Sequence, residues 1–104
     1  MKKDFEGVEN RTKMKVLQED IKKYQELFPL AGSCEIVHRS IKSLLCKEDF
    51  RLLKSGGYEC FVTVTQGTVL ECSSLSSFKG VGKSKKKAKA NAFGHYLLKL
   101  INFE

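Results

Sequence analysis

Lysine residues gather near the carboxyl end of this 104-residue chain, where the pattern predicts a change from strand to helix. The segment from Gly80 to Lys89 reads Gly-Val-Gly-Lys-Ser-Lys-Lys-Lys-Ala-Lys. We expect Ser84 to cap a helix that begins directly after it, because a serine oxygen accepts hydrogen bonds from the free N–H groups of a helix start. Those N–H groups and the helix dipole attract anions, and nearby ammonium groups strengthen the attraction. The chemistry predicted for this segment is phosphate binding.

Three of the lysines can face one partner. At 3.6 residues per turn, Lys85, Lys86 and Lys89 fall within an arc of about 100° on the predicted helix, whereas Lys87 points elsewhere. Lysine is a flexible point charge, so it suits backbone phosphates better than base edges. The alternative is that the lysines only keep an exposed helix in solution, as charge runs commonly do.

The positive charge of the chain is concentrated in the same region. The whole sequence has 19 Lys and Arg against 12 Asp and Glu, a net charge of +7. Residues 72–104 contain seven lysines and one acidic residue, a net charge of +6, whereas residues 1–71 contribute only +1. A localised basic segment is typical of a protein with a polyanionic partner.

Other chemistries have little support in the sequence. The glycines of Gly80-x-Gly82 lack the third glycine of a dinucleotide-binding loop, and no phosphate-binding loop of the G-x-x-x-x-G-K-[ST] type is present. The two histidines, His38 and His95, accompany no nucleophile, carboxylate pair or metal-ligand spacing. We therefore expect no enzymatic activity, no cofactor and no metal site, although a Cys/His site assembled from distant positions stays open as an alternative.

The cysteine spacing and the apolar pattern predict the compartment. Cysteines at 34, 46, 60 and 72 form no Cys-x-x-Cys pair, which fits a reducing intracellular compartment. No window is apolar enough for a membrane span, and Met1-Lys2-Lys3-Asp4-Phe5-Glu6 has no signal-peptide character. We expect an intracellular protein without a membrane partner, nuclear or cytoplasmic or both. The lysine run also fits a nuclear localisation signal.

Two helices are predicted in the first half of the chain. Apolar residues at helical spacing over 12–28 predict an amphipathic helix that Pro29 ends, and we expect it to pack on its own domain. The stretch 33–47 predicts a second helix with Ser33 as its N-cap.

The second half predicts strands and a final helix. A short strand over 50–53 and a turn at 54–57 lead into a strand in which alternate residues face the core, namely Tyr58, Cys60, Val62 and Val64. Residues 66–77 carry no clear signal. A strand over 78–82 has glycines that allow another backbone to approach. The helix after Ser84 runs to about Ile101 and buries a stripe of Ala88, Ala92, Tyr96 and Leu100. Gly94 within it marks either close packing or a slack point.

These segments resemble the double-stranded RNA-binding domain. The resemblance rests on Tyr58-x-Cys60-x-Val62-x-Val64 and on Phe78-x-Gly80-x-Gly82-x-Ser84-Lys85-Lys86-x-Ala88-Lys89-x-x-Ala92. It implies an α+β fold of the order α-β-β-β-α, with both helices on one face of a three-stranded antiparallel sheet. The predicted domain spans 33–104, and residues 1–32 add an N-terminal helical extension.

The resemblance also implies a function. Members of the family bind A-form RNA by shape, through minor grooves and the phosphates between them, over ~16 bp. Carried over to this sequence, Lys85, Lys86 and Lys89 straddle the major-groove phosphates, and Lys83 and Lys79 support them. The prediction is a non-catalytic module that binds double-stranded RNA independently of sequence and belongs to a larger protein.

The sequence departs from the family pattern in ways that favour an alternative. The loop 54–57 lacks the proline and histidine with which the family enters a minor groove, and 66–77 is longer than the usual turn. Phe93 and Tyr96 replace small residues of the last helix, which implies altered packing or a new apolar surface. The alternative is a degenerate domain that serves protein–protein interaction or homodimerisation, through the N-terminal helix and the end of the last helix, at Phe93, Leu98, Ile101 and Phe103.

Overall fold

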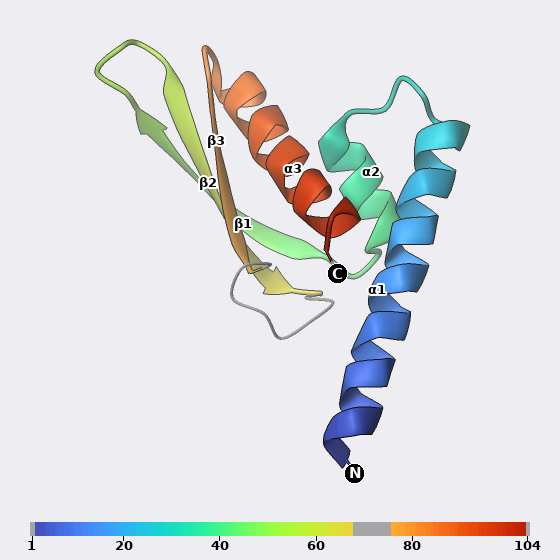
Figure 1. Ribbon diagram of the computed structural model, residues 1–104. Coiled ribbons are helices and arrows are strands. Elements are labelled where there is room, and N and C mark those ends of the chain that lie inside the picture. The colour runs from blue at the N-terminus through green and yellow to red at the C-terminus, as the bar shows by residue number, and fades with distance from the viewer. Residues whose placement is uncertain (1, 68–75, 104) are drawn as a thin grey trace.

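Over residues 2–67 and 76–103 the chain forms three helices and a sheet of three antiparallel strands (Figure 1). The computed structural model describes residues 2–67 and 76–103. In chain order the elements are α1 (Lys2–Leu27), α2 (Ser33–Ser40), β1 (Leu45–Leu52), β2 (Tyr58–Gln66), β3 (Ser77–Gly82) and α3 (Lys85–Ile101). The predicted α+β class is confirmed.

The sheet has the order β1-β2-β3, and both neighbouring pairs are antiparallel. The predicted turn joins β1 to β2: the Leu53 N–H donates to the Gly57 carbonyl at 2.7 Å, and the Gly56 N–H donates to the Leu53 carbonyl at 3.0 Å. Gly56 has a φ of +93°, a conformation that glycine adopts without steric cost. The alternation predicted for β2 is also confirmed, because Cys60, Val62 and Val64 are buried.

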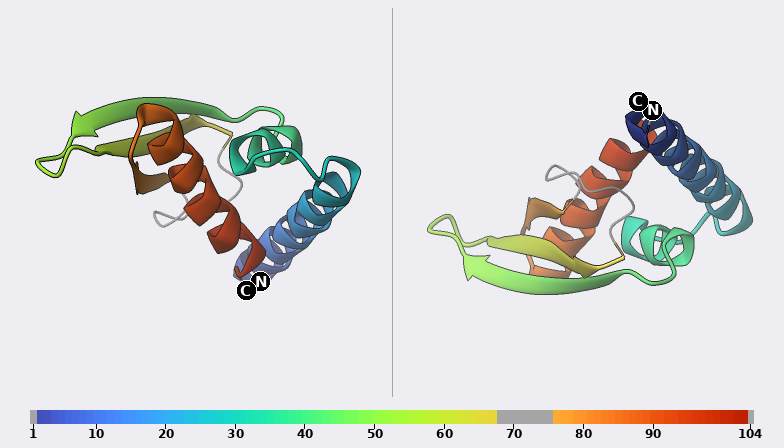
Figure 2. Two further views of the ribbon diagram at one scale, coloured as in Figure 1. Left: turned by 90° about the horizontal axis from the view of Figure 1, so that it is seen from above. Right: turned by 90° about the horizontal axis from the view of Figure 1, so that it is seen from below.

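The helices differ in how directly they pack against the sheet. α3 lies across one face and contacts β2 and β3, α2 packs beside α3, and α1 packs against both helices as the outermost element (Figure 2). One hydrophobic core joins all these elements. The opposite face of the sheet is covered by no helix in the ranges 2–67 and 76–103. No helix in the same ranges is long and apolar enough to cross a membrane.

Two glycines of β3 let α3 come close to the sheet. A Cβ atom added at Gly80 would overlap the backbone of Ala92, and one added at Gly82 would lie 2.6 Å from the Ala88 nitrogen. Ala88 and Ala92 are themselves fully buried. The predicted close approach of another backbone at these glycines is confirmed.

The aromatic residues of α3 belong to the core. The rings of Phe78 and Tyr96 stack with centroids 4.3 Å apart, and the Phe93 ring meets Phe78 edge-on at 5.0 Å. Phe93 and Tyr96 are completely buried. The inclusion of Phe93 in an exposed association surface is therefore wrong: the larger side chains fill the space between α3, β3 and α2 instead.

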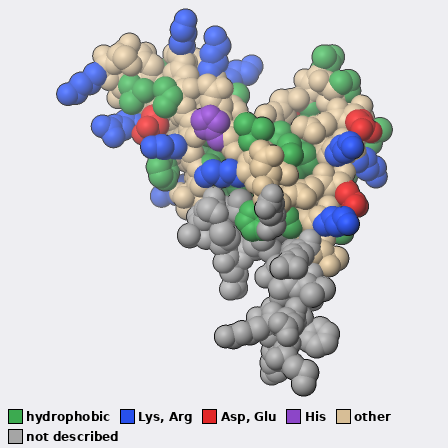
Figure 3. Space-filling view, in the orientation of Figure 1, with side chains coloured by type: hydrophobic (Ala, Val, Ile, Leu, Met, Phe, Trp, Pro, Cys, Tyr) green, Lys and Arg blue, Asp and Glu red, His purple; other side chains and the backbone are tan. Residues whose placement is uncertain are grey.

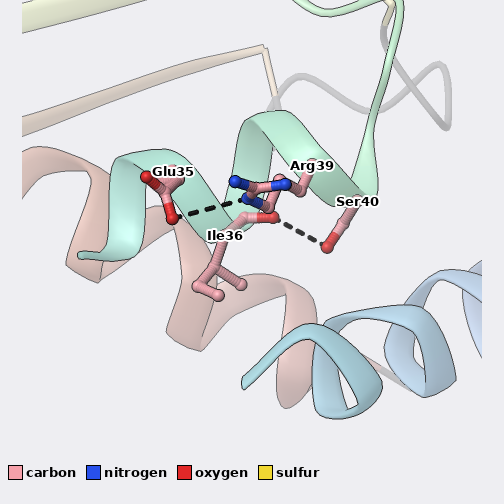
Figure 4. Close-up of polar contacts among 4 residues, drawn as sticks. All are labelled: Glu35, Ile36, Arg39 and Ser40. Atoms are coloured by element: carbon pink, nitrogen blue, oxygen red, sulfur yellow. Dashed lines mark hydrogen bonds and ion pairs between the residues drawn. The ribbon is translucent and has the colours of Figure 1, made fainter. Parts of the chain in front are cut away.

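The second helix is shorter than predicted. α2 ends at Ser40, where the Ser40 hydroxyl donates to the Ile36 carbonyl at 2.8 Å, and Arg39 forms an ion pair with Glu35 at 3.4 Å (Figure 4). Residues 45–47, which we expected in this helix, begin β1, because pairing with β2 replaces the helical hydrogen bonds. The predicted N-cap is also wrong, since Gly32 occupies that position without a side-chain hydrogen bond.

The first helix starts well before residue 12 and ends one residue before Phe28. Its buried face consists of Met14, Leu17 and Ile21, so the prediction that it packs on its own domain is confirmed. The Gln18 side-chain amide donates to carbonyl oxygens at the end of α3, at 2.9 Å to Leu100, 3.2 Å to Ile101 and 2.8 Å to Phe103. α1 thus supplies a hydrogen-bond donor to the carboxyl end of α3. The proposed domain boundary at residue 32 stays a prediction.

Candidate nucleic-acid interface

The start of α3 is built as the lysine run predicts. The Ser84 hydroxyl accepts a hydrogen bond from the Lys87 N–H at 3.2 Å, which confirms the cap. The Ala88 N–H donates to the Ser84 carbonyl at 2.9 Å, so the helix is regular from its first turn. That turn contains no acidic residue. The positive end of the helix dipole and the lysine charges therefore act in the same direction.

Four lysines are exposed at this end of α3, namely Lys83, Lys85, Lys86 and Lys87. Lysine and arginine side chains gather over the end of the molecule that carries the start of α3 and the β1–β2 turn (Figure 3). Their charges are accessible to a large anionic surface. The sequence alone predicts this exposure, because these lysines directly flank the predicted cap at Ser84, where the helix begins.

Lys85 is directed toward the sheet by aromatic side chains. Its ammonium nitrogen lies 5.7 Å from the centroid of the Phe50 ring and 5.8 Å from that of Tyr58. Phe50 keeps 38% of its surface exposed. A cation near an exposed aromatic face contributes about 0.5–1 kcal/mol and limits the directions of the side chain. The role of Phe50 was missed in the sequence, because it depends on how β1 pairs with β2.

Lys89, which the sequence predicted to contact RNA phosphates, forms an ion pair within the chain. Its ammonium nitrogen lies 3.2 Å from a carboxylate oxygen of Glu48, and both side chains are partly exposed. Partial burial lowers the pKa of Lys89, but the hydrogen bond to Glu48 and the charges nearby raise it by more, so the net shift is upward. Lys89 is thus held over β1 rather than free beside Lys86.

Lys79 lies apart from the lysines of α3. It is on β3, directly opposite Phe61 of β2, so both side chains belong to the sheet face without a helix. Phe61 is 44% exposed, as expected for a residue that alternates with the core-facing residues of β2. The structure therefore separates Lys79 from Lys83, Lys85 and Lys86.

α3 also covers the outer edge of β3 through two polar side chains. The Asn91 amide donates to the Val81 carbonyl at 2.5 Å, and Nδ1 of His95 lies 3.0 Å from the Lys79 carbonyl oxygen. Next to them is a cavity of about 450 Å³, lined by Phe61, Ser77, Phe78, Lys79, His95 and Lys99. The sequence predicted no catalytic or metal-binding role for His95, and its contact with β3 was not foreseen. The signal for its role was the four-residue spacing of Asn91, His95 and Lys99 on one side of α3.

A second concave region lies between α1 and α3. One cavity of about 530 Å³ is lined by residues that include Ile21 and Ile101. Another of about 220 Å³ is lined by Ile36, Leu97 and residues at the end of α1. Beside them Leu98 is 58% exposed and Ile101 39% exposed, whereas Phe103 is partly buried against the core.

Three of the four cysteines lie in the described part of the chain. Cys60 is buried in the core as predicted, Cys34 and Cys46 are partly buried, and Cys72 lies outside the described residues. Burial raises the pKa of all three described thiols. Within 2–67 and 76–103, no group of three or more His, Cys, Asp or Glu side chains could hold a metal ion.

No protein-family model, no curated protein and no solved structure matches this chain.

Proposed function

We propose that this chain is a non-catalytic module that binds double-stranded RNA through the start of α3. The observation that carries the proposal is the group of four exposed lysines at a serine-capped helix start without an acidic residue in its first turn. The order α2-β1-β2-β3-α3, with α3 across one face of the antiparallel sheet, agrees with the fold that the double-stranded RNA-binding family uses.

The arrangement favours phosphates over bases. Lys83, Lys85, Lys86 and Lys87 extend from one turn of the helix and the residues before it, and flexible ammonium groups suit phosphates at varied positions. Gly56 and Gly57 of the β1–β2 turn offer no side chain that reads a groove. Recognition in this proposal is therefore independent of sequence and sensitive to salt.

The test is a titration of a ~16 bp RNA duplex at several salt concentrations. A Lys85→Ala/Lys86→Ala variant should lose about two phosphates' worth of salt dependence and at least about tenfold in affinity at low salt. The matched control, Lys13→Ala/Lys22→Ala, removes the same charge from the exposed side of α1 and should bind nearly as well as the unmodified chain. Equal losses in both variants, or no duplex binding by the unmodified chain, would refute the proposal.

A second candidate function is self-association through the groove between α1 and α3. The exposed side chain of Ile101, which lines that groove, and the exposed Leu98 three residues before it on α3 favour it. The expected readout is a dimer in sedimentation equilibrium that a Leu98→Ser/Ile101→Ser variant converts to monomer. A monomer at all concentrations excludes this candidate and leaves the duplex proposal unaffected.

A further inference from the structure

The cavity beside β3 combines features that the duplex proposal does not use. Its volume of about 450 Å³ lies within the range of small-molecule sites. Its walls come from three elements, with Phe61 on β2, Lys79 on β3, and His95 and Lys99 on α3. None of these residues belongs to the lysine group at the start of α3.

His95 is held in one orientation. A carbonyl oxygen can only accept a hydrogen bond, so the 3.0 Å contact with Lys79 requires that Nδ1 of His95 carries the proton. This bond directs the ring along the edge of β3 and leaves Nε2 as the ring atom available to a ligand. A histidine fixed through one nitrogen is a pre-oriented polar contact rather than a freely rotating surface residue.

The remaining walls favour a ligand with two parts. The Phe61 ring is 44% exposed and supplies a flat apolar surface on which another ring can stack. Lys79 lies opposite Phe61 across the β2–β3 pair, and Lys99 is one helical turn beyond His95, so positive charge lies on more than one side of the cavity. Among the residues that the structure describes, no Asp or Glu lines it. An aromatic ring that carries a phosphate satisfies both parts.

We propose that this cavity binds a single unpaired nucleotide, with its base against Phe61 and its phosphate held by Lys79 and Lys99 beside His95. Stacking on an aromatic side chain tolerates any base, because every base has a π face. The ligand is either a free nucleoside monophosphate or one nucleotide of a single-stranded RNA, which offer the same chemistry. The site is independent of the duplex interface, since the two share no residue.

The experiment follows the ring signals of Phe61 and His95 by NMR in the full chain. The probes are AMP, UMP, adenosine, inorganic phosphate and a short single-stranded oligoadenylate. We expect saturable shifts with AMP and UMP, and binding at least about tenfold weaker for adenosine or phosphate alone, because each lacks one of the two parts. Stronger binding of the oligonucleotide than of AMP identifies single-stranded RNA as the source of the ligand, and the reverse identifies the free nucleotide.

Variants test the residues. Phe61→Leu and Lys99→Gln should each raise the dissociation constant for AMP by about five- to tenfold, whereas the control Lys13→Gln, on the exposed side of α1, should leave it unchanged. Loss of duplex binding in Lys85→Ala/Lys86→Ala should leave AMP binding intact, so the two proposals can fail separately. No saturable shift with either monophosphate, or equal affinity in Phe61→Leu, overturns the inference.

Discussion

The ion pair between Lys89 and Glu48 sets how much lysine charge is free at the start of α3. Lys83, Lys85, Lys86 and Lys87 are exposed, whereas Lys89 is held over β1 by a carboxylate 3.2 Å away. A partly exposed ion pair contributes less than about 1 kcal/mol to stability. Its larger effect is on the field of the surface, because Glu48 cancels one of the charges that a polyanion meets.

Removing the Glu48 charge should therefore improve duplex binding. We expect Glu48→Gln to steepen the salt dependence by about one phosphate and to raise affinity by a few-fold at low salt. The matched control is Asp49→Asn, which removes the same charge from the neighbouring position on the opposite face of β1. If Asp49→Asn has an equal effect, net charge alone explains the change and Lys89 has no part in it.

Alkaline pH should destabilise the fold through Tyr96. Burial raises the pKa of its hydroxyl from 10.0 to about 12. The unfolded chain therefore loses the Tyr96 proton first, so the stability contributed by the protonated hydroxyl is complete below pH 10 and is lost as pH rises toward 12. Tyr96→Phe should show a smaller fall in the free energy of unfolding between these values, measured by urea titration.

The thiols of Cys34, Cys46 and Cys60 act in the same direction from a lower pH, because partial or full burial also raises their pKa above 9.0. Their effect is common to the unmodified chain and Tyr96→Phe, so the difference between the two isolates the tyrosine. An identical pH dependence in both proteins would contradict the assignment.

At the scale of elements, the sequence predicted the features that depend on interactions between residues close together in the chain. The alternation of β2, the turn at 54–57 and the serine cap of α3 each depend on interactions within a few residues, and each is confirmed. The end of α2 depends instead on long-range pairing. Apolar spacing continues through Leu44 and Leu45 as in a helix, but the β1–β2 ladder takes residues from Leu45 onward.

The candidate site likewise has features that the local sequence predicts and others that depend on strand pairing. Exposure of the lysines after Ser84 could be predicted because it needs only a helix start. The contacts of Lys85 with Phe50 and of Lys89 with Glu48 could not, since both partners are placed by the register of β1 on β2. The cavity at β3 also escaped prediction because its lining comes from three elements.

Two glycines allow a direct test of how α3 packs. A Cβ at Gly94 would lie 3.6 Å from the Ser33 hydroxyl oxygen, an ordinary contact, so Gly94 is not required by close packing. Gly94→Ala should stabilise the helix by about 1 kcal/mol and raise the melting temperature by about 4–8 °C. Gly80→Ala should lower it strongly, because the added methyl overlaps the Ala92 backbone. A fall with Gly94→Ala would contradict this description of the helix.

At the scale of the whole molecule, α1 packs against both α2 and α3. Its buried residues Met14, Leu17 and Ile21 join the core that α2 and α3 share. Gln18 adds hydrogen bonds to three carbonyls at the end of α3. The basic surface at the start of α3 and the support from α1 thus lie at opposite ends of the same helix.

Loss of the Gln18 amide should loosen that end of α3 first. We expect Gln18→Ala to destabilise the protein by about 1–2 kcal/mol, because the carbonyls at the helix end lose their donor. Hydrogen exchange should accelerate for the last turn of α3 while the turn after Ser84 stays protected. Gln25→Ala, an exposed glutamine on the same helix, is the control; equal acceleration in both variants would exclude a specific role for Gln18.

The hydrogen bonds of Asn91 and His95 to β3 have a consequence for aggregation. The outer edge of a sheet can recruit a strand from another chain and start a cross-β polymer. Two outward carbonyls of β3 are already occupied by these side chains, so that edge is a poor template. The other edge, β1, alternates Lys47, Asp49 and Arg51 on one face, and charges of this kind discourage fibril growth. Replacing both Asn91 and His95 by alanine should therefore leave a folded chain that polymerises more readily in concentrated solution.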